Sequence, residues 1–273
     1  MLDFLGIGAQ KSGTTWLYEM LARHPQVAFP AGKEAHFWNN PGRDRAHYLG
    51  LFEAGPDGIR RGEITPAYSL LEEDTIRAIH AVNPQLRILF SMRNPLHRAW
   101  SSALMALRRA ELSVQEASDQ WFLDHFRSAG STGRGDYEGT LRRWRAVFPA
   151  EQILVLDYDG IRDAPDCLLR DCARHLGIDE ACFAGMGSDT LGRRVFAGPG
   201  HMLPPRLHDA LVELYAPRIR SLSRYLGLDL RHWLDEGYRQ EPAANDPRLA
   251  GPARSGLSAI ATPAAVARRA QSH

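Results

Sequence analysis

The polar stretch Gln-Lys-Ser-Gly-Thr-Thr, residues 10–15, has the composition of a loop that binds a phosphate-like anion. None of its side chains is bulky enough to shield the backbone, so several N–H groups can point at one ligand. A helix that starts near Thr14 would add unsatisfied N–H donors and the positive end of its dipole. The candidate anion-binding residues are Lys11, Ser12, Gly13, Thr14, Thr15 and Trp16.

The loop departs from the usual phosphate-binding loop of nucleoside triphosphatases. The pattern G-x-x-x-x-G-K-[ST] would run from Gly8 to Gly13, but Thr14 stands where that pattern requires lysine. An ordinary strand-to-helix turn with Thr15 as helix cap is the alternative interpretation. Only two of the 33 Lys and Arg side chains are lysines, Lys11 and Lys33. Because arginine and lysine are not equivalent at anion sites, this bias favours a functional Lys11.

A second polar group falls within four residues, Lys33, Glu34 and His36. Loops that follow strands of an open α/β sheet are the usual places for ligands. Glu34 is a candidate general base, and partial burial beside Phe37 and Trp38 would have to raise its pKa for that work. His36 is the rival base because its ordinary pKa is already near neutral. A solvated loop without chemistry is the alternative.

A second anion could bind where the apolar run of residues 86–92 ends at Arg93 and a helix opens at Pro95. Ser101 lies two helical turns beyond Asn94, on a face that can turn back toward the arginine. The alternative for a lone arginine is an ion pair with a surface carboxylate.

The surrounding pattern predicts an α/β protein with a mainly parallel sheet flanked by helices. We expect one domain over residues 1–240 and a disordered tail over residues 241–273. The expected strands cover residues 4–7, 26–30, 86–92 and 152–157. One expected helix begins near residue 14. The others cover residues 72–82, 135–148, 165–176, 206–215 and 219–226. Residues 128–135, Ser-Ala-Gly-Ser-Thr-Gly-Arg-Gly, should interrupt a helical region as a mobile loop on the substrate side.

Composition excludes some classes of partner. The net charge is +1, so no broad basic field points to nucleic acid or to an anionic membrane. The chain enters its first expected strand at once and has no apolar run of 18 residues, so we expect no signal peptide and a cytoplasmic protein. Cys167, Cys172 and Cys182 lack zinc-finger spacing, and we expect them to be reduced and structural.

Four motifs together resemble those of sulfotransferases that use 3′-phosphoadenosine-5′-phosphosulfate (PAPS). The sequence QKSGTTWL is similar to the family's 5′-phosphosulfate loop, and RNPLHRAWS is similar to its 3′-phosphate element. The segment KEAHFW follows the K-E-x-H-F-[FW] pattern of heparan sulfate and related carbohydrate sulfotransferases, whose Glu is the catalytic base. The segment GEITPAY resembles G-E-K-[ST]-P-x-Y, but Ile64 replaces the lysine, so that lysine's role cannot be transferred.

The resemblance implies a P-loop-like sulfotransferase fold and transfer of a sulfuryl group from PAPS, leaving 3′,5′-bisphosphate (PAP), to a hydroxyl or amine of a carbohydrate or small molecule. Lys11 would neutralise the leaving oxygen, and Glu34 would be the base, with His36 second and Glu63 third. The implied 3′-phosphate ligands are Arg93, Ser101, Arg193 and Arg194. The implied acceptor contacts are Lys33, Glu34, Glu63 and Tyr68. This scheme requires no metal.

Two other functions stay open at this stage. A P-loop nucleotide kinase or NTPase would need a set of magnesium ligands, and the displaced lysine and the second anion site argue against it. A nucleotide-binding module without catalysis would bind the bisphosphate and transfer nothing. The motifs leave the identity of the acceptor undetermined.

Overall fold

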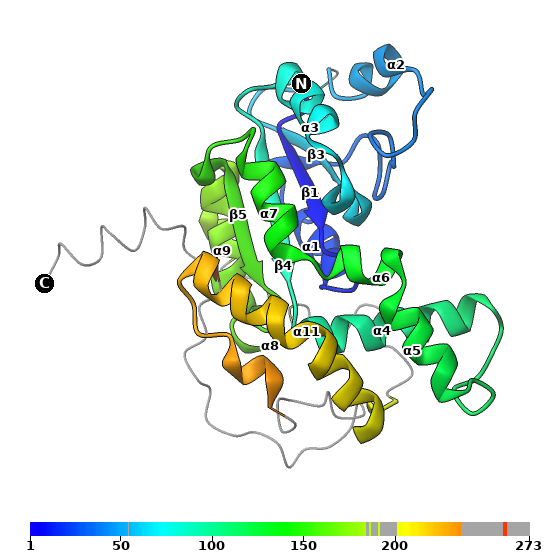
Figure 1. Cartoon of the computed structure of the whole chain (residues 1–273). Coiled ribbons are helices and arrows are strands. Elements are labelled where there is room, and N and C mark those ends of the chain that lie inside the picture. Colours follow the sequence, from blue (N-terminus) through cyan, green and yellow to red (C-terminus); the bar gives the residue numbers. More distant parts are fainter. Residues whose placement is uncertain (54, 184–185, 187–190, 192–200, 236–258, 261–273) are drawn as a thin grey trace, which may run out of the picture. The chain divides into compact units, whose positions relative to one another are not determined.

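The computed structural model describes residues 1–53, 55–183, 186, 191, 201–235 and 259–260 (Figure 1). The chain divides into two compact units. The first comprises Met1–Met92, Gly139–Val195 and Ser255–His273, and the second comprises Arg93–Glu138 and Phe196–Arg254. Of the expected tail, only residues 259–260 are among those described.

A six-stranded sheet organises the first unit, in the order β2-β3-β1-β4-β5-β6. The first five strands in that order are parallel, and β6 runs antiparallel to β5. The strands are β1 (Phe4–Gly8), β2 (Val27–Ala28), β3 (Arg60–Ile64), β4 (Arg87–Met92), β5 (Ile153–Asp157) and β6 (Ala259–Ile260). The expectation of a mainly parallel sheet is confirmed, although the strand expected over residues 26–30 keeps only two residues.

Strand β3 was not expected from the sequence. Its residues Arg-Arg-Gly-Glu-Ile lack both an apolar run and an alternating pattern, which are the usual signals of a strand. It nevertheless lies between β2 and β1, and Glu63 within it is completely buried. A buried charged residue in the sheet therefore hid this strand from pattern reading.

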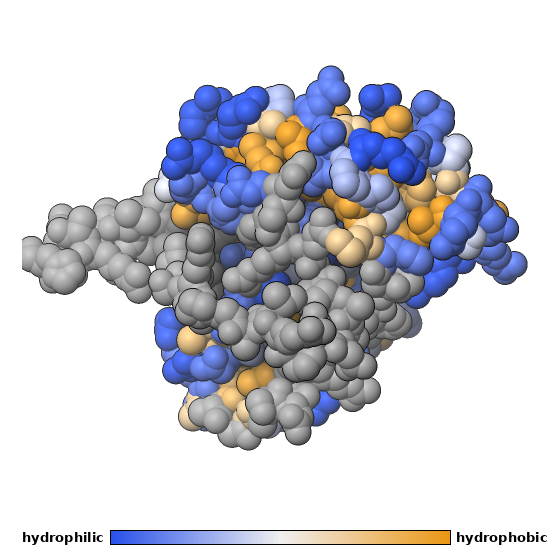
Figure 2. Space-filling view, turned by 90° about the horizontal axis from the view of Figure 1, so that it is seen from below, coloured by the Kyte–Doolittle hydropathy of each residue, from blue (hydrophilic) through white to orange (hydrophobic). Residues whose placement is uncertain are grey.

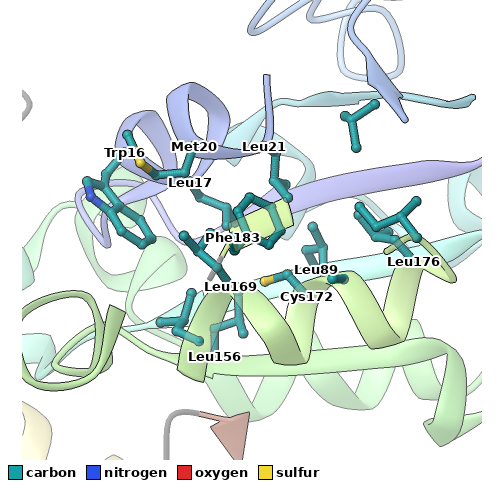
Figure 3. Close-up of a cluster of buried hydrophobic side chains, with 14 of the residues drawn as sticks. Trp16, Leu17, Met20, Leu21, Leu89, Leu156, Leu169, Cys172, Leu176 and Phe183 are labelled. Atoms are coloured by element: carbon teal, nitrogen blue, oxygen red, sulfur yellow. The ribbon is translucent and has the colours of Figure 1, made fainter. Parts of the chain in front are cut away.

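Helices α1 (Thr14–Leu21) and α9 (Pro165–Leu176) cover one face of the sheet (Figure 3). Their apolar stripes meet in one buried cluster that also includes Leu89 of β4 and Leu156 of β5. Each fully buried side chain of this size contributes about 1.5–3 kcal/mol to folding. Helix α9 ends at Gly177 in the left-handed conformation, as its sequence predicts.

Figure 1 shows α7 (Tyr137–Arg145) in front of the sheet, on the side opposite α1. Its expected stripe at positions 137, 141, 144 and 148 is buried, as predicted for core packing. The remaining helical elements described in the first unit are α2 (Arg45–Gly50), η1 (Pro66–Leu70), α3 (Glu73–Val82), η2 (Ala150–Gln152), α8 (Gly160–Asp163) and η3 (Glu180–Phe183).

The described part of the second unit is helical, and it corrects two expectations. Residues expected to be a mobile loop form helix α6, with Ser128 accepting the Ser131 N–H at its start. The two expected C-terminal helices are one helix that contains Pro217. Its apolar stripe, including Tyr215 and Ile219, is buried on both sides of the proline, so packing outweighs the lost hydrogen bond. The elements are α4 (Pro95–Arg109), α5 (Asp119–Arg127), α6 (Ala129–Arg134), α11 (Pro205–Leu226) and η4 (Arg231–Leu234).

Large apolar side chains exposed among the described residues are Met1, Leu112 and Met202. Figure 2 accordingly shows a face on which hydrophilic side chains cover much of the described surface and apolar ones form patches. No helix within the described ranges is both long and apolar enough to span a membrane.

The three cysteines are free thiols. Cys172 lies in the core, where burial raises the pKa of its thiol, whereas Cys182 is exposed. The expected structural role therefore fits Cys172 and does not fit Cys182.

Candidate active site

The cradle loop, residues 9–13, connects the end of β1 to the start of α1. Its backbone is held against the end of β4: the Ala9 N–H donates to the Ser91 carbonyl at 2.8 Å, and the Ser91 hydroxyl donates to the Ser12 carbonyl at 2.6 Å. These two bonds tie the loop to the carboxyl edge of the sheet, where open α/β sheets bind ligands.

Helix α1 begins without a capping side chain. Its N-cap is Gly13, with φ 77°, which makes no side-chain cap hydrogen bond, and the first turn contains no acidic residue. The interpretation of Thr15 as helix cap is therefore wrong. The positive φ of Gly13 favours glycine, and a Cβ there would lie 2.2 Å from Cδ1 of Ile161, so that side chain would have to move.

Two further observations fit an anion at this helix start. The Ser12 hydroxyl is completely buried and has no hydrogen-bond partner among the described residues. An unpaired buried hydroxyl is uncommon and costs free energy, and this one is free to donate to an anion bound at the helix start. The indole of Trp16 is different: it lies in the core and donates to the Leu191 carbonyl at 3.0 Å (Figure 3). Only the backbone N–H of Trp16 remains for the predicted cofactor contact.

The base loop, residues 33–38, lies beside the neighbouring strand end. Its Glu34 N–H donates to the Ile64 carbonyl of β3 at 3.1 Å. The Glu34 carboxylate contacts the Lys33 ammonium, and its Oε2 lies 3.6 Å from Nε2 of His36. The three chemically active side chains predicted here are thus brought together.

The carboxylate of Glu34 is not buried as expected. Its side chain is 41% exposed, so Phe37 and Trp38 do not exclude water from it. They pack instead with Tyr48, and the rings of Phe37 and Tyr48 stack 4.1 Å apart. This exposure leaves Glu34 accessible to an acceptor.

Left-handed backbone conformations gather in these two loops. Among the described residues, four other than glycine have positive φ: Lys11, Glu34, His36 and Glu111, with φ between 54° and 70°. Such conformations cost of order 1–3 kcal/mol each and cluster at functional sites. Three of the four are residues predicted from sequence to do chemistry.

Glu63 and Tyr68, predicted acceptor contacts, are both 0% exposed and bond to each other at 2.8 Å. Neither side chain presents a surface to an acceptor in this structure. Their carboxylate and phenol point inward, beneath the base loop.

Two of the predicted 3′-phosphate residues, Arg93 and Ser101, belong to the second unit. Arg93 directly follows β4 and is half-buried, as is Ser101 within α4. Asn94 caps α4 by accepting the Leu96 N–H at 2.8 Å. Arg193 and Arg194 lie outside the described residues.

Sequence reasoning missed Asp157, at the carboxyl end of β5. Burial, followed by the negative charge of Asp159, raises the pKa of Asp157 from 3.8 to about 6. Its chain neighbour Tyr158 packs near Gly13 of the cradle loop. The available signal was an acidic residue ending an apolar strand, the position at which α/β sheets bind ligands.

Comparisons with known proteins identify the family of the chain. A sulfotransferase domain model matches residues 2–183. The mouse heparan sulfate glucosamine 3-O-sulfotransferase 6 is 31% identical over 163 residues, which cover 58% of this chain and 47% of that relative. The chain thus spans about half the length of the relative it matches.

Solved structures share the fold. The sulfotransferase from Alicyclobacillus acidocaldarius has a TM-score of 0.67 and 25% identity, covering 86% of this chain and 99% of its own. The mouse sulfotransferase SULT7A1, solved with PAP, has a TM-score of 0.55 and 18% identity, covering 82% and 89%. The family model spans more than half of the sequence, and the chain belongs to the sulfotransferase domain family.

Proposed function

We propose that this protein transfers a sulfuryl group from PAPS to a hydroxyl or amine of a carbohydrate or small-molecule acceptor. Its family membership supports this activity. The observation that carries the proposal is the pairing of two loops at neighbouring strand ends: an uncapped helix start with a buried, unpaired Ser12 hydroxyl, and an exposed Glu34 beside His36.

The cradle loop suits the 5′ end of PAPS, which supplies an activated sulfuryl group attached to a phosphate leaving group. The Ser12 hydroxyl and the N–H groups of the first turn of α1 are donors without a protein acceptor in that turn. Lys11 would offset negative charge on the leaving oxygen, while Thr14 and Thr15 would hold the 5′ end. Arg93 and Ser101 would bind the 3′-phosphate, with Arg193 and Arg194 as further proposed ligands.

Glu34 would accept the proton of the acceptor hydroxyl. Its exposure gives an acceptor access, and its contact with Lys33 orients one carboxylate oxygen while the other faces His36. A positioned base contributes about 10²–10⁴-fold to such reactions. His36 remains the second candidate, since its Nδ1 lies 3.2 Å from Oδ1 of Asn39 and its Nε2 faces Glu34.

A heparan sulfate oligosaccharide is the first acceptor to test, because the relatives are named for that substrate. Incubation with labelled PAPS should yield labelled oligosaccharide, and a labelled-PAPS screen of cell extract covers small-molecule acceptors. Absence of transfer to every acceptor, despite binding of PAP, would favour a nucleotide-binding module without catalysis. The predicted cytoplasmic location can be checked by cell fractionation.

Calorimetry separates the proposal from a nucleotide kinase or NTPase. We expect PAP to bind without magnesium and to bind more tightly than ATP, because the cradle loop and Arg93 would serve two separate anions. Tighter binding of ATP that depends on magnesium would overturn the proposal.

A further inference from the structure

Glu63 in β3 is a buried carboxylate that accepts four hydrogen bonds. Its Oε1 accepts the hydroxyls of Tyr48 at 2.5 Å and Tyr68 at 2.8 Å, and its Oε2 accepts the Thr65 hydroxyl at 2.7 Å and the Ala35 N–H at 3.1 Å. A carboxylate has about four acceptor positions, so all are occupied. No Lys, Arg or His in the described ranges forms an ion pair with it.

The partners of Glu63 extend the network to the base loop. The Tyr68 hydroxyl accepts the N–H groups of Phe37 at 3.0 Å and Trp38 at 3.3 Å, and the Thr65 hydroxyl lies 3.5 Å from the His36 N–H. Together with the Ala35 N–H, four consecutive backbone N–H groups turn toward this buried carboxylate. The Ala35 N–H reaches the carboxylate itself, and the other three bond to hydroxyls that donate to the carboxylate.

The left-handed conformations of the base loop follow from this arrangement. With the N–H groups of residues 35–38 directed inward, Glu34 (φ 63°) and His36 (φ 54°) adopt the turns that let their side chains meet outside. Strained backbone persists only where its surroundings determine it, and the Glu63 network supplies that constraint.

The protons in the network have defined places. Burial and the adjacent Glu63 charge raise the pKa of Tyr48 and of Tyr68, so both phenols stay protonated and donate. All four groups that bond to Glu63, three hydroxyls and one N–H, therefore act as donors. A glutamine at this position would turn its NH₂ either toward two phenols or toward Thr65 and the Ala35 N–H, and each orientation opposes donors to donors.

We propose that Glu63 is a positioning residue, which holds the base loop so that Glu34 and His36 are oriented for reaction, rather than an acceptor contact. This inference rests on the proposed function for its kinetic consequence. The proposal also replaces the acceptor contact expected of Tyr68 from the sequence. The Tyr68 hydroxyl donates to Glu63 and accepts the N–H groups of Phe37 and Trp38, so it connects the carboxylate to the base loop.

The test compares Glu63→Gln and Tyr68→Phe with the wild-type chain, using labelled PAPS and heparan sulfate oligosaccharide or whichever extract acceptor is labelled. Turnover is normalised to the concentration of PAP-binding sites, so that misfolded protein does not count. We expect kcat to fall about 100-fold in Glu63→Gln, the scale of misplacing a reacting group by about 1 Å. PAP affinity should change less than about threefold, because the cradle loop is untouched.

Glu63→Asp retains the carboxylate and should recover part of the lost kcat. Tyr68→Phe keeps the volume and Glu63 but removes the acceptor for two N–H groups, and it should lower kcat less than Glu63→Gln. Normal kcat with a raised acceptor KM in Glu63→Gln would indicate an acceptor contact and overturn the proposal.

Amide hydrogen exchange tests the same inference without any turnover. The N–H groups of residues 35–38 should exchange faster in Glu63→Gln than in the wild-type chain, while those of β4 stay unchanged. Unchanged exchange at residues 35–38 would overturn the positioning role. Absence of sulfuryl transfer by the wild-type chain would instead refute the proposed function and leave the exchange result valid.

Discussion

The cradle loop and the base loop leave the same edge of one sheet, yet they offer opposite kinds of group. The cradle loop presents backbone N–H groups and a buried hydroxyl at the start of a helix. The base loop turns its N–H groups inward, toward Glu63, and presents the side chains of Glu34 and His36.

The difference reflects what each loop has to bind or do. An anion held by many N–H groups needs the backbone to face outward, and local sequence is enough to arrange a glycine-containing turn before a helix. A base must project a side chain, so the backbone behind it needs an internal partner. Here the partner is a carboxylate on the adjacent strand.

The largest effect should come from the base loop. Glu34→Gln removes the proton acceptor without changing size, and we expect turnover to fall about 10³-fold with PAP affinity unchanged. Steady-state kinetics and calorimetry measure the two. Glu73→Gln is a matched control, since Glu73 is equally exposed and also ion-paired. Unimpaired turnover in Glu34→Gln would exclude it as the base and point to His36.

Removing charge from the cradle loop should affect both binding and turnover. For Lys11→Ala we expect turnover to fall about 100-fold, because a charged group facing developing negative charge is lost. PAP affinity should fall about tenfold, a loss of about 1.4 kcal/mol. Isothermal titration with PAP checks this, and Arg77→Ala serves as an exposed control. Normal PAP affinity in Lys11→Ala would refute the proposed role of the cradle loop in binding the nucleotide.

Asp157 next to the cradle loop contrasts with Glu63 below the base loop. Within the described part of the chain the Asp157 carboxyl accepts a single hydrogen bond, from the Asp159 N–H at 3.1 Å. The pKa of Asp157 is raised from 3.8 to about 6 in the folded protein, so folding favours the protonated carboxyl. The contribution of this group to stability is therefore fully present below pH 3.8 and is lost as the pH rises through 6. Asp157→Asn should therefore stabilise the protein by about 3 kcal/mol at pH 8 and by little at pH 4.

Urea denaturation at the two pH values measures this difference. The charged neighbours are Asp159, Asp163 and Arg162, and all three are kept in the variant. Asp166→Asn, on an exposed ion-paired carboxylate, should show no such pH dependence. Equal stabilisation by Asp157→Asn at both pH values would contradict the raised pKa.

The smallest effect should come from Ser12→Ala. Loss of a buried, unpaired hydroxyl should stabilise the free protein by about 1 kcal/mol. The same change should weaken PAP binding about threefold, because the hydroxyl would donate to the bound anion. Ser69→Ala is the matched control, since the buried Ser69 hydroxyl donates to the Pro66 carbonyl, and that change should destabilise. A destabilised Ser12→Ala chain would mean that this hydroxyl has a partner within the protein.

Much of the fold was readable because its signals are local. Buried parallel strands β4 and β5 appear as apolar runs, and α9 ends at a glycine that only a left-handed cap requires. Strand β3 was missed because its buried residues include the charged Arg61 and Glu63, and the partners of Glu63 lie up to 28 positions away. Two helices were predicted in place of α11, separated near Pro217, because local helix propensity does not reflect the packing on either side of the proline.

The sequence by itself determined the chemical groups: a lysine in a small polar loop, a Lys-Glu-x-His segment and an arginine at a strand end. Those assignments depend on residue types within a few positions of one another. Only the tertiary structure decided that Glu63 faces inward and that Glu34 is exposed. Hydrogen bonds between residues distant in the chain determine which way a carboxylate points, and no local pattern encodes them.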